Sequence, residues 1–444
     1  MTESPNDKKF MREKIVKPKE TKGQKAGRFF CLVLCAVILG IVAAVSFVVS
    51  LPLAKKYIVT ETTTQTVPIT IEKDHEPDTT AVMETMEPTA PAETLPEPES
   101  VPAIADEDEI REIVKEEMAQ SEWTLEDIRA FQYTLTKLGA EADSSIVTVS
   151  SVKQQVDWFD NPVESTGQYA GVILAVNPAE VVILCGEQAV DQADSLRVAF
   201  HDGTIADGTV KKKDTVAGMA VISVAAETLN ELTMEQIQIM ELGNSYSVKS
   251  GDLLLAVGSP SGHVRSVKNG MVNYVAKGVQ TVDGHTRVLY TDVECNEEKG
   301  TFFLNLSGQL IGWATDAFRT EDNAGETMIM PISEYKGVLQ KLSNGIDVPY
   351  LGIMGLEVSA FMQDEGLPKG IYITESIKEG PAYLAGIQNG DILTMIQGQE
   401  VLTIRDFQSK LEAMQSGAEI LVTVARKGID SYKEIEYRVT IGAR

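Results

Sequence analysis

The chain has 444 residues, 43% of them hydrophobic, which is enough for two to three domains with ordinary cores. It carries 39 Lys and Arg against 65 Asp and Glu, a formal net charge of −26, and this acidic balance excludes nucleic-acid binding as a first hypothesis. Four cysteines without a CxxC motif or a Cys/His cluster indicate neither a disulfide framework nor a zinc site, so we expect no metal and no cofactor.

Positive charge is concentrated at the N-terminus. Residues 1–28 form a basic arm with nine basic and four acidic side chains, and residues 29–54 contain no charged side chain. A helix of that length spans the roughly 30 Å hydrocarbon core of a bilayer, whereas the apolar core of a cleavable signal peptide is usually only about 7 to 15 residues long. We therefore predict a single-pass anchor in the cell membrane, with a cytoplasmic N-terminus and extracytoplasmic C-terminal domains.

The next segment, 55–105, reads as an acidic linker rich in Thr, Pro and Glu. Between residues 57 and 109 there are 14 acidic residues, seven prolines and eleven threonines, and Lys73 is the one basic residue. Such a segment cannot bury enough apolar surface to offset the entropy of ordering, so the sequence predicts an extended tether.

Residues 106–140 show apolar side chains at three- and four-residue intervals, which predicts one broken or two short amphipathic helices. This helical neck either lies on its own domain, which is the favoured interpretation, or serves as an oligomerisation element.

Short β-strands separated by turn signals are predicted over residues 141–342. Such a series indicates a mainly β domain, a sandwich or barrel, and its length suits two barrels. The apolar or β-branched runs are Ser145–Val149, Ala170–Val176, Val181–Leu184, Ser195–Phe200, Met219–Val224 and Leu253–Val257.

Several motifs in this region follow one another in an order that resembles the HtrA/Do family of serine proteases. They include the runs Ala170–Leu174, Val198–Thr204, Gly258–Gly262, Asn269–Val272 and Leu306–Gly312. The resemblance implies a chymotrypsin-like double β-barrel that cuts peptide bonds with a Ser-His-Asp triad, and an assembly into homo- or hetero-trimers with HtrA-like relatives.

The three catalytic positions that this resemblance implies are all substituted. Gln188 stands at the histidine position, Gly218 at the aspartate position, and Lys299 or Gly300 at the serine position. An amide cannot take a proton from a hydroxyl near neutral pH, so general-base catalysis is lost. Cys295, four to five residues before the serine position, is a remote candidate for a substitute nucleophile.

Two cysteines flank the substituted segments. Cys185 and Cys295 either form a disulfide across the cleft between the barrels or remain free thiols, and the sequence leaves both alternatives open.

Residues 346–444 resemble a PDZ domain of the HtrA type, an α/β module, on the strength of the run Gly380–Leu393. In such a domain the N–H groups of a loop converge on a peptide carboxylate, and a strand edge pairs with the extended peptide. The loop is Tyr350, Leu351, Gly352 and Ile353, and Phe407 and Leu411, four apart on one helix face, either line the pocket for the terminal side chain or pack in the core.

The sequence thus favours a membrane-tethered pseudoprotease that binds peptide C-termini or unfolded polypeptides as a scaffold or regulator in envelope protein quality control. Two alternatives stay open: an active endopeptidase with a rearranged site, and a purely structural spacer that spans the cell wall.

Overall fold

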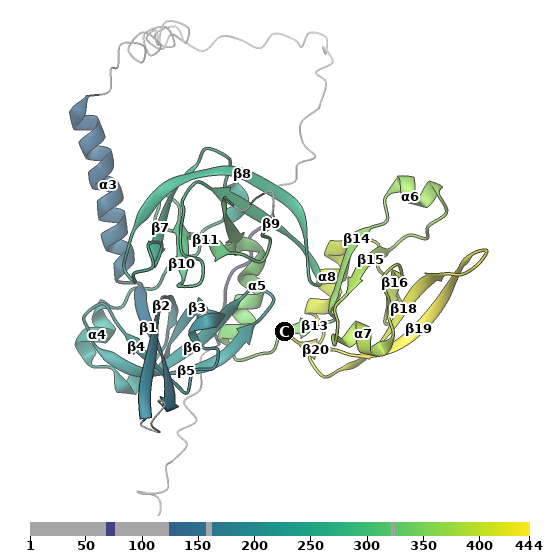
Figure 1. Ribbon diagram of the computed structural model, residues 1–444, viewed down its shortest axis with the longest axis horizontal. Helices are drawn as coiled ribbons and strands as arrows, with labels where there is room; N and C mark the ends of the chain where they lie inside the picture. Colours follow the sequence, from purple (N-terminus) through teal and green to yellow (C-terminus); the bar gives the residue numbers. More distant parts are fainter. Residues whose placement is uncertain (1–67, 76–123, 157–161, 321–322, 324) are drawn as a thin grey trace, which may run out of the picture. The chain divides into compact units, whose positions relative to one another are not determined.

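The computed structural model describes residues 68–75, 124–156, 162–320, 323 and 325–444 (Figure 1). The chain divides into two compact units, Met1–Thr66 and Val67–Arg444, and all described residues belong to the second. The predicted basic arm and the predicted membrane anchor at 29–54 lie outside the described residues, as do residues 106–123 of the predicted neck. Among the helices that are described, none has the length and apolar character to cross a bilayer.

Six antiparallel strands close the first barrel in the order β1-β2-β3-β6-β5-β4. The apolar runs predicted as strands all lie here or in the second barrel, and their buried faces fill the barrel interiors. The strands are β1 (Ile146–Val156), β2 (Pro162–Val176), β3 (Glu180–Gly186), β4 (Ser195–Ala199), β5 (Ile205–Asp214) and β6 (Met219–Ala225). Short helices η1 (Glu187–Ala189), η2 (Ala226–Thr228) and α4 (Glu231–Gln236) connect them or follow the last.

A second closed barrel follows, with strand order β10-β11-β12-β9-β8-β7, so the predicted double barrel is confirmed. Its strands β8 and β9 form a hairpin with a two-residue turn at Val282-Asp283. The elements are η3 (Ser245–Ser247), β7 (Leu253–Gly258), β8 (Lys268–Thr281), β9 (Gly284–Thr291), β10 (Thr301–Leu304), β11 (Leu310–Thr315) and β12 (Thr327–Pro331).

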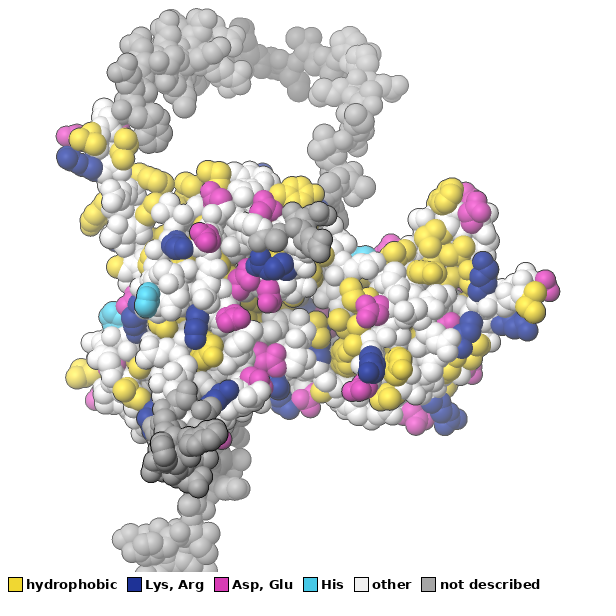
Figure 2. Space-filling view, in the orientation of Figure 1, with side chains coloured by type: hydrophobic (Ala, Val, Ile, Leu, Met, Phe, Trp, Pro, Cys, Tyr) yellow, Lys and Arg dark blue, Asp and Glu magenta, His cyan; other side chains and the backbone are white. Residues whose placement is uncertain are grey.

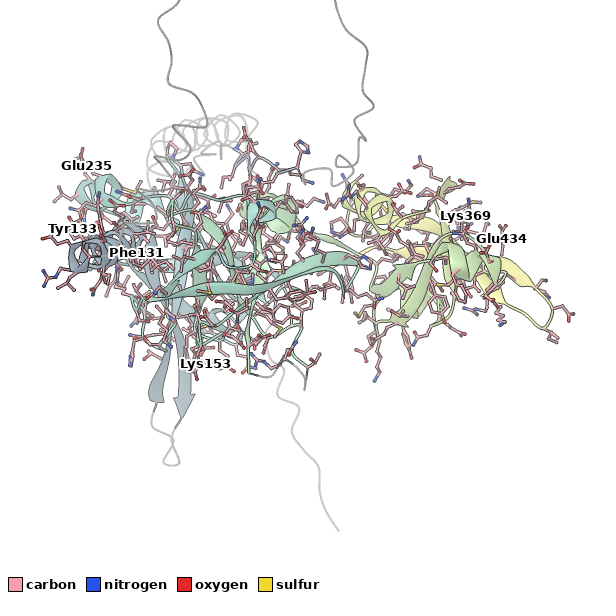
Figure 3. The ribbon with its side chains drawn as sticks, turned by 90° about the horizontal axis from the view of Figure 1, so that it is seen from above. Phe131, Tyr133, Lys153, Glu235, Lys369 and Glu434 are labelled. Atoms are coloured by element: carbon pink, nitrogen blue, oxygen red, sulfur yellow. The ribbon has the colours of Figure 1, made fainter. Side chains whose placement is uncertain are left out.

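Helix α3 (Leu125–Asp143) occupies the second part of the region in which neck helices are expected. Thr124 caps it, accepting a bond from the N–H of Asp127 while the Asp127 carboxylate accepts the Thr124 N–H. Only its C-terminal part is buried, at Gly139 and Ala142. Phe131 and Tyr133 stand on its outer part (Figure 3) and are 42% and 70% exposed.

Part of the predicted linker is packed rather than free. The extended segment 68–75 lies on α5 (Ile332–Ser343), where the N–H of Ile69 donates to the side chain of Asn344 at 2.9 Å. Asp74 forms an ion pair of 2.8 Å with Lys336, whose side chain is only 6% exposed. The composition argument misses this segment because Ile69 and Ile71 supply apolar contacts that an average over the whole linker hides.

The C-terminal module is a PDZ-type sheet in the order β14-β15-β16-β18-β19, with β17 paired to β16 and with its own core. Its elements are β13 (Pro349–Tyr350), β14 (Ile353–Glu357), α6 (Ala360–Asp364), β15 (Ile371–Ser376), α7 (Pro381–Ala385), β16 (Ile392–Ile396), β17 (Gln399–Glu400), α8 (Ile404–Glu412), β18 (Glu419–Lys427), β19 (Tyr432–Thr440) and β20 (Gly442–Ala443).

Surface charge is mixed on the described domains. On the face seen in Figure 2, acidic and basic side chains lie interspersed and form no continuous surface of one sign.

Candidate functional site

The first substituted position is held by the turn that follows β3. Gln188 lies in η1, and a Cβ added at Gly186 would meet its Oε1 at 3.0 Å, so the amide folds back toward its own strand end. The N–H of the neighbouring Glu187 donates to the carbonyl of Gly218 at 2.8 Å. The positions expected to hold histidine and aspartate are therefore adjacent, but Gln188 supplies an amide side chain and Gly218 supplies no side chain.

The third position lies in the loop before β10, and it shares a pocket with the other two. Gln188, Gly218 and Gly300 all line this pocket between the barrels, together with Thr301 and Phe302. All four histidines of the chain are described, and none of them lines the pocket. The sequence alignment of the three positions is thus reproduced in space, without an imidazole.

Backbone groups of the loop are engaged in bonds that hold its shape. The N–H of Lys299 donates to the side chain of Asn296 at 3.0 Å, and the Lys299 carbonyl accepts the N–H of Ala170 at 2.8 Å. The Gly300 carbonyl accepts the N–H of Ser259 at 2.9 Å. An oxyanion hole needs N–H groups aimed at a shared free point, and the Lys299 N–H is not free to contribute.

Gly300 has no room for a side chain. Its φ is +85°, a conformation that side-chain-bearing residues rarely adopt, and a Cβ there would lie 2.5 Å from the carbonyl oxygen of Ala170. Lys299 instead directs its ammonium to the ring of Tyr169, 4.5 Å from the centroid. Neither alignment of the serine position can therefore present a nucleophile to the pocket.

The pocket is also lined by acidic side chains. Glu297, Glu298 and Asp316 all face it, and Arg319 forms an ion pair with Glu297. A tetrahedral intermediate of peptide hydrolysis carries an oxyanion, which neighbouring carboxylates would destabilise. Acidic side chains in the lining therefore disfavour the oxyanion that acyl transfer would form.

Two of the four histidines, His201 and His285, have partners for their side chains away from the pocket. The Nδ1 of His201 lies 2.7 Å from the carboxylate of Asp143, which Arg265 also contacts at 2.6 Å. His285 lies on β9, with its Nε2 3.2 Å from the carbonyl oxygen of Gly355 in the PDZ domain. Neither imidazole lies near a serine or cysteine position that the sequence singled out.

Both candidate cysteines are free thiols in the structure. Cys185 packs in the core of the first barrel and Cys295 against the core of the second, so the two side chains belong to different interiors and do not bridge the cleft. Burial raises the pKa of Cys185 to about 12 and also raises that of Cys295, whose Sγ lies 3.9 Å from the Thr327 hydroxyl. Since the thiolate is the nucleophile, a raised pKa makes Cys295 a poor substitute for serine.

Thiol reactivity checks this arrangement. We expect Cys185 to resist alkylation by iodoacetamide at pH 8 in the native protein, because its raised pKa leaves almost no thiolate and its side chain is inaccessible. Cys295 should react more slowly than a free peptide thiol but faster than Cys185. Peptide mapping by mass spectrometry reads each cysteine separately, and equal labelling of Cys185 in native and urea-unfolded protein would contradict the packing.

The PDZ domain presents the loop that the sequence predicted. Gly352 has a φ of +81°, which turns the backbone so that the N–H groups of Leu351, Gly352 and Ile353 point to one place. Tyr350 flanks the loop, and a Cβ at Gly352 would meet its ring at 3.1 Å. Three convergent N–H groups form a binding site for a carboxylate.

The two predicted pocket residues on α8 both pack in the core of the PDZ domain. Phe407 is 1% exposed and packs inside the PDZ core, so the core alternative describes it and the pocket assignment does not. Leu411 is 4% exposed and belongs to the same core, and it also lines a cavity bounded by the β8–β9 turn and α5. Gln408, which the sequence analysis did not single out, faces the β8–β9 hairpin and donates to the carbonyl of His285 at 3.4 Å.

One residue at the carboxylate loop was missed altogether. The side chain of Asp283, from the turn between β8 and β9, accepts the N–H groups of Leu351, Gly352 and Ile353 at 2.8 to 3.1 Å. Burial raises the pKa of Asp283, and these hydrogen bonds and the charge of Arg444 oppose that shift. The contact joins residues 68 to 70 positions apart, and no local sequence pattern signals it.

Comparison with known proteins agrees with this architecture. Residues 170–312 match the family model of the trypsin-like peptidase domain, and residues 372–426 match that of the PDZ domain. The chain is 26% identical over 332 residues to the serine protease Do-like HtrA of Bacillus subtilis, covering 70% of this chain and 71% of that protein. It is 28% identical over 277 residues to the putative serine protease HhoB of Synechocystis, covering 59% of this chain and 64% of that protein.

Among solved structures, the HtrA-type protease AlgW with a decapeptide has a similar fold. The TM-score is 0.50 at 20% sequence identity, and the match covers 70% of this chain and 98% of AlgW.

Proposed function

Because the chain belongs with the HtrA/Do-like proteins, which join a trypsin-like peptidase domain to a C-terminal PDZ domain, we propose that it binds polypeptides without cutting them. In this proposal the double barrel is a pseudoprotease body, and the PDZ domain recognises peptide C-termini or exposed segments of unfolded proteins. The role that follows is that of a scaffold or regulator in protein quality control.

The observation that carries the proposal is the pocket between the barrels. Gln188, Gly218 and Gly300 line it together, and no histidine does. Loss of a catalytic triad typically lowers the turnover number about 10⁶-fold, and the activity that remains depends on an intact oxyanion hole. The bond from the Lys299 N–H to Asn296 argues against such a hole here.

Location and assembly are further parts of the proposal. The uncharged run at 29–54, preceded by the basic arm, supports a single-pass anchor with the barrels and the PDZ domain outside the cytoplasm. Assembly into trimers, alone or with active relatives, would place a peptide-binding subunit beside working proteases.

An active endopeptidase is the second candidate, because the similar proteins are named serine proteases. Degradation of unfolded casein separates the two. We expect the purified full-length protein to leave casein intact over hours in conditions where a trypsin control digests it completely. Any residual cleavage should be identical in the Gln188→Ala and Lys299→Ala variants, which identifies it as contamination, whereas cleavage that either variant abolishes would refute the pseudoprotease proposal.

A further inference from the structure

The carboxylate loop of the PDZ domain is filled by a side chain of the same chain. We propose that Asp283, at the tip of the β8–β9 hairpin, is an internal substitute for a ligand C-terminus, and that it closes the peptide groove until a peptide carboxylate displaces it. This inference rests on the proposed peptide-binding function and assigns a regulation to the same site.

The hydrogen bonds of Asp283 are those expected of a bound terminal carboxylate. Its Oδ2 accepts the N–H of Leu351 at 2.8 Å, and its Oδ1 accepts the N–H groups of Gly352 at 2.9 Å and Ile353 at 3.0 Å. The N–H of Gly352 is shared between both carboxylate oxygens, since its nitrogen also lies 3.1 Å from Oδ2. Every N–H group that the sequence assigned to ligand recognition is therefore already engaged.

The backbone of the hairpin tip also occupies the place of a ligand strand. The N–H of Asp283 donates to the carbonyl of Ile353 at 2.7 Å, the bond with which an added strand would begin on the edge of β14. His285 continues the contact at Gly355, and Gln408 on α8 reaches the His285 carbonyl from the other side. The tip thus contacts both β14 and α8, and Figure 1 shows the end of the hairpin reaching this module.

The turn has a conformation that costs energy. Asp283 has a φ of +60°, in the left-handed region, although it is not a glycine, and only 6% of its surface is exposed. Asp adopts this region more readily than most residues with side chains, but the conformation is still sparsely populated and persists where surrounding contacts determine it. The bonds to the PDZ loop supply those contacts, while burial of the carboxylate opposes them.

The hydrogen bonds of Asp283 favour the closed state, whereas its backbone conformation and the burial of its carboxylate oppose it, so the closed state is reversible. The Asp283 carboxylate is tethered to the PDZ loop and competes with a free peptide at an effective concentration in the millimolar range. The apparent affinity for the peptide is therefore the intrinsic affinity multiplied by the fraction of molecules in the open state. If the closed form is roughly ten times more populated than the open form, removing Asp283 should tighten peptide binding about tenfold.

The test uses full-length protein and fluorescein-labelled decapeptides that end in Val, Leu, Ile or Phe, each as a free acid and as an amide. Asp283→Asn keeps the shape and tolerates a positive φ, but it places an NH₂ group against an N–H donor. Asp283→Ala removes every acceptor. Asp430→Ala, in the exposed turn between β18 and β19, is the control for the change in charge.

We expect both Asp283 variants to bind a free-acid peptide about tenfold more tightly than the wild type and the Asp430 variant. Hydrogen exchange gives a readout that needs no ligand: the amides of Leu351, Gly352 and Ile353 should be protected in the wild type and should exchange faster in Asp283→Asn. Equal affinities, or equally fast exchange at these amides in wild type and variant, would overturn the inference. If exchange at these amides increases in the variant but no peptide binds to any form of the protein, the result supports Asp283 as the internal occupant of the loop and refutes the proposed peptide-binding function.

Discussion

Substituting serine for Gly300 is expected to destabilise the protein by about 3 kcal/mol and to produce no protease. The left-handed backbone costs a side-chain-bearing residue about 1 to 2 kcal/mol, and overpacking typically costs a further 1 to 3 kcal/mol. The clash is with backbone, because the added Cβ would lie 2.5 Å from the Ala170 carbonyl oxygen. Combining Gly300→Ser with Gln188→His and Gly218→Asp should likewise give no casein cleavage.

Gly203→Ser is the matched control for this substitution. Gly203 has a φ of +87°, close to the +85° of Gly300, but a Cβ there would meet nothing within 4 Å. Its cost should be about 1 kcal/mol, the conformational part alone. Urea unfolding followed by circular dichroism measures both, and equal losses for the two variants would show that the loop before β10 can move away from β2.

Asp391→Ala is expected to destabilise the PDZ domain by about 3 kcal/mol. Asp391 is 1% exposed and accepts two bonds of 2.7 Å from the guanidinium of Arg426 and one of 2.8 Å from the N–H of Gln388. Removing the carboxylate leaves the partly buried guanidinium of Arg426 without its partner. Breaking a buried ion pair typically lowers the free energy of unfolding by about 3 to 5 kcal/mol, and the loss is smaller where solvent reaches the remaining charge. The fork of Arg426 also holds the carbonyl of Gly386 at 2.9 Å, so the turn after α7 should loosen.

An exposed ion pair of the same type supplies the control. Arg438 and Glu419 join β19 to β18 at 3.4 Å, and their side chains are 77% and 62% exposed. Glu419→Ala should change stability by less than about 0.5 kcal/mol, because exposed pairs contribute little. Hydrogen exchange of the β16 and β18 amides reports the PDZ domain separately from the barrels, and similar exchange in both variants would contradict the structural role of Asp391.

Continuous apolar runs bounded by turn residues were sufficient to predict the strands that are buried on both faces. The runs at β3 and β6 are continuous apolar segments inside a barrel, and they are readable without a structure. Strand β5 was missed because Lys211, Lys212 and Lys213 give it a polar sequence, while its pairing with β4 and β6 is a property of the closed barrel. Strand β8 has a single buried residue among its fourteen, and only Asn269–Val272 near its start matched a motif.

Some parts of the candidate sites were likewise predictable from sequence motifs, whereas contacts between distant parts of the chain were not. Gln188, Gly218 and the loop at Gly300 could be singled out from sequence because the motifs around them resemble those of the HtrA/Do family, and they line one pocket. The occupant of the PDZ loop could not, because Asp283 is an ordinary turn residue until the hairpin meets another domain. The sequence also left open whether Phe407 lines the peptide groove. The apolar spacing of a helix predicts which side chains are buried, but it does not tell whether they pack in the core or against a ligand.

The central claim is that the cleft between the barrels holds no activated nucleophile. Exposure of the full-length protein to a fluorophosphonate, followed by intact mass spectrometry, tests it most directly. We expect an unchanged mass after an incubation that fully labels trypsin. A stoichiometric adduct that maps to residues 296–303 would contradict it.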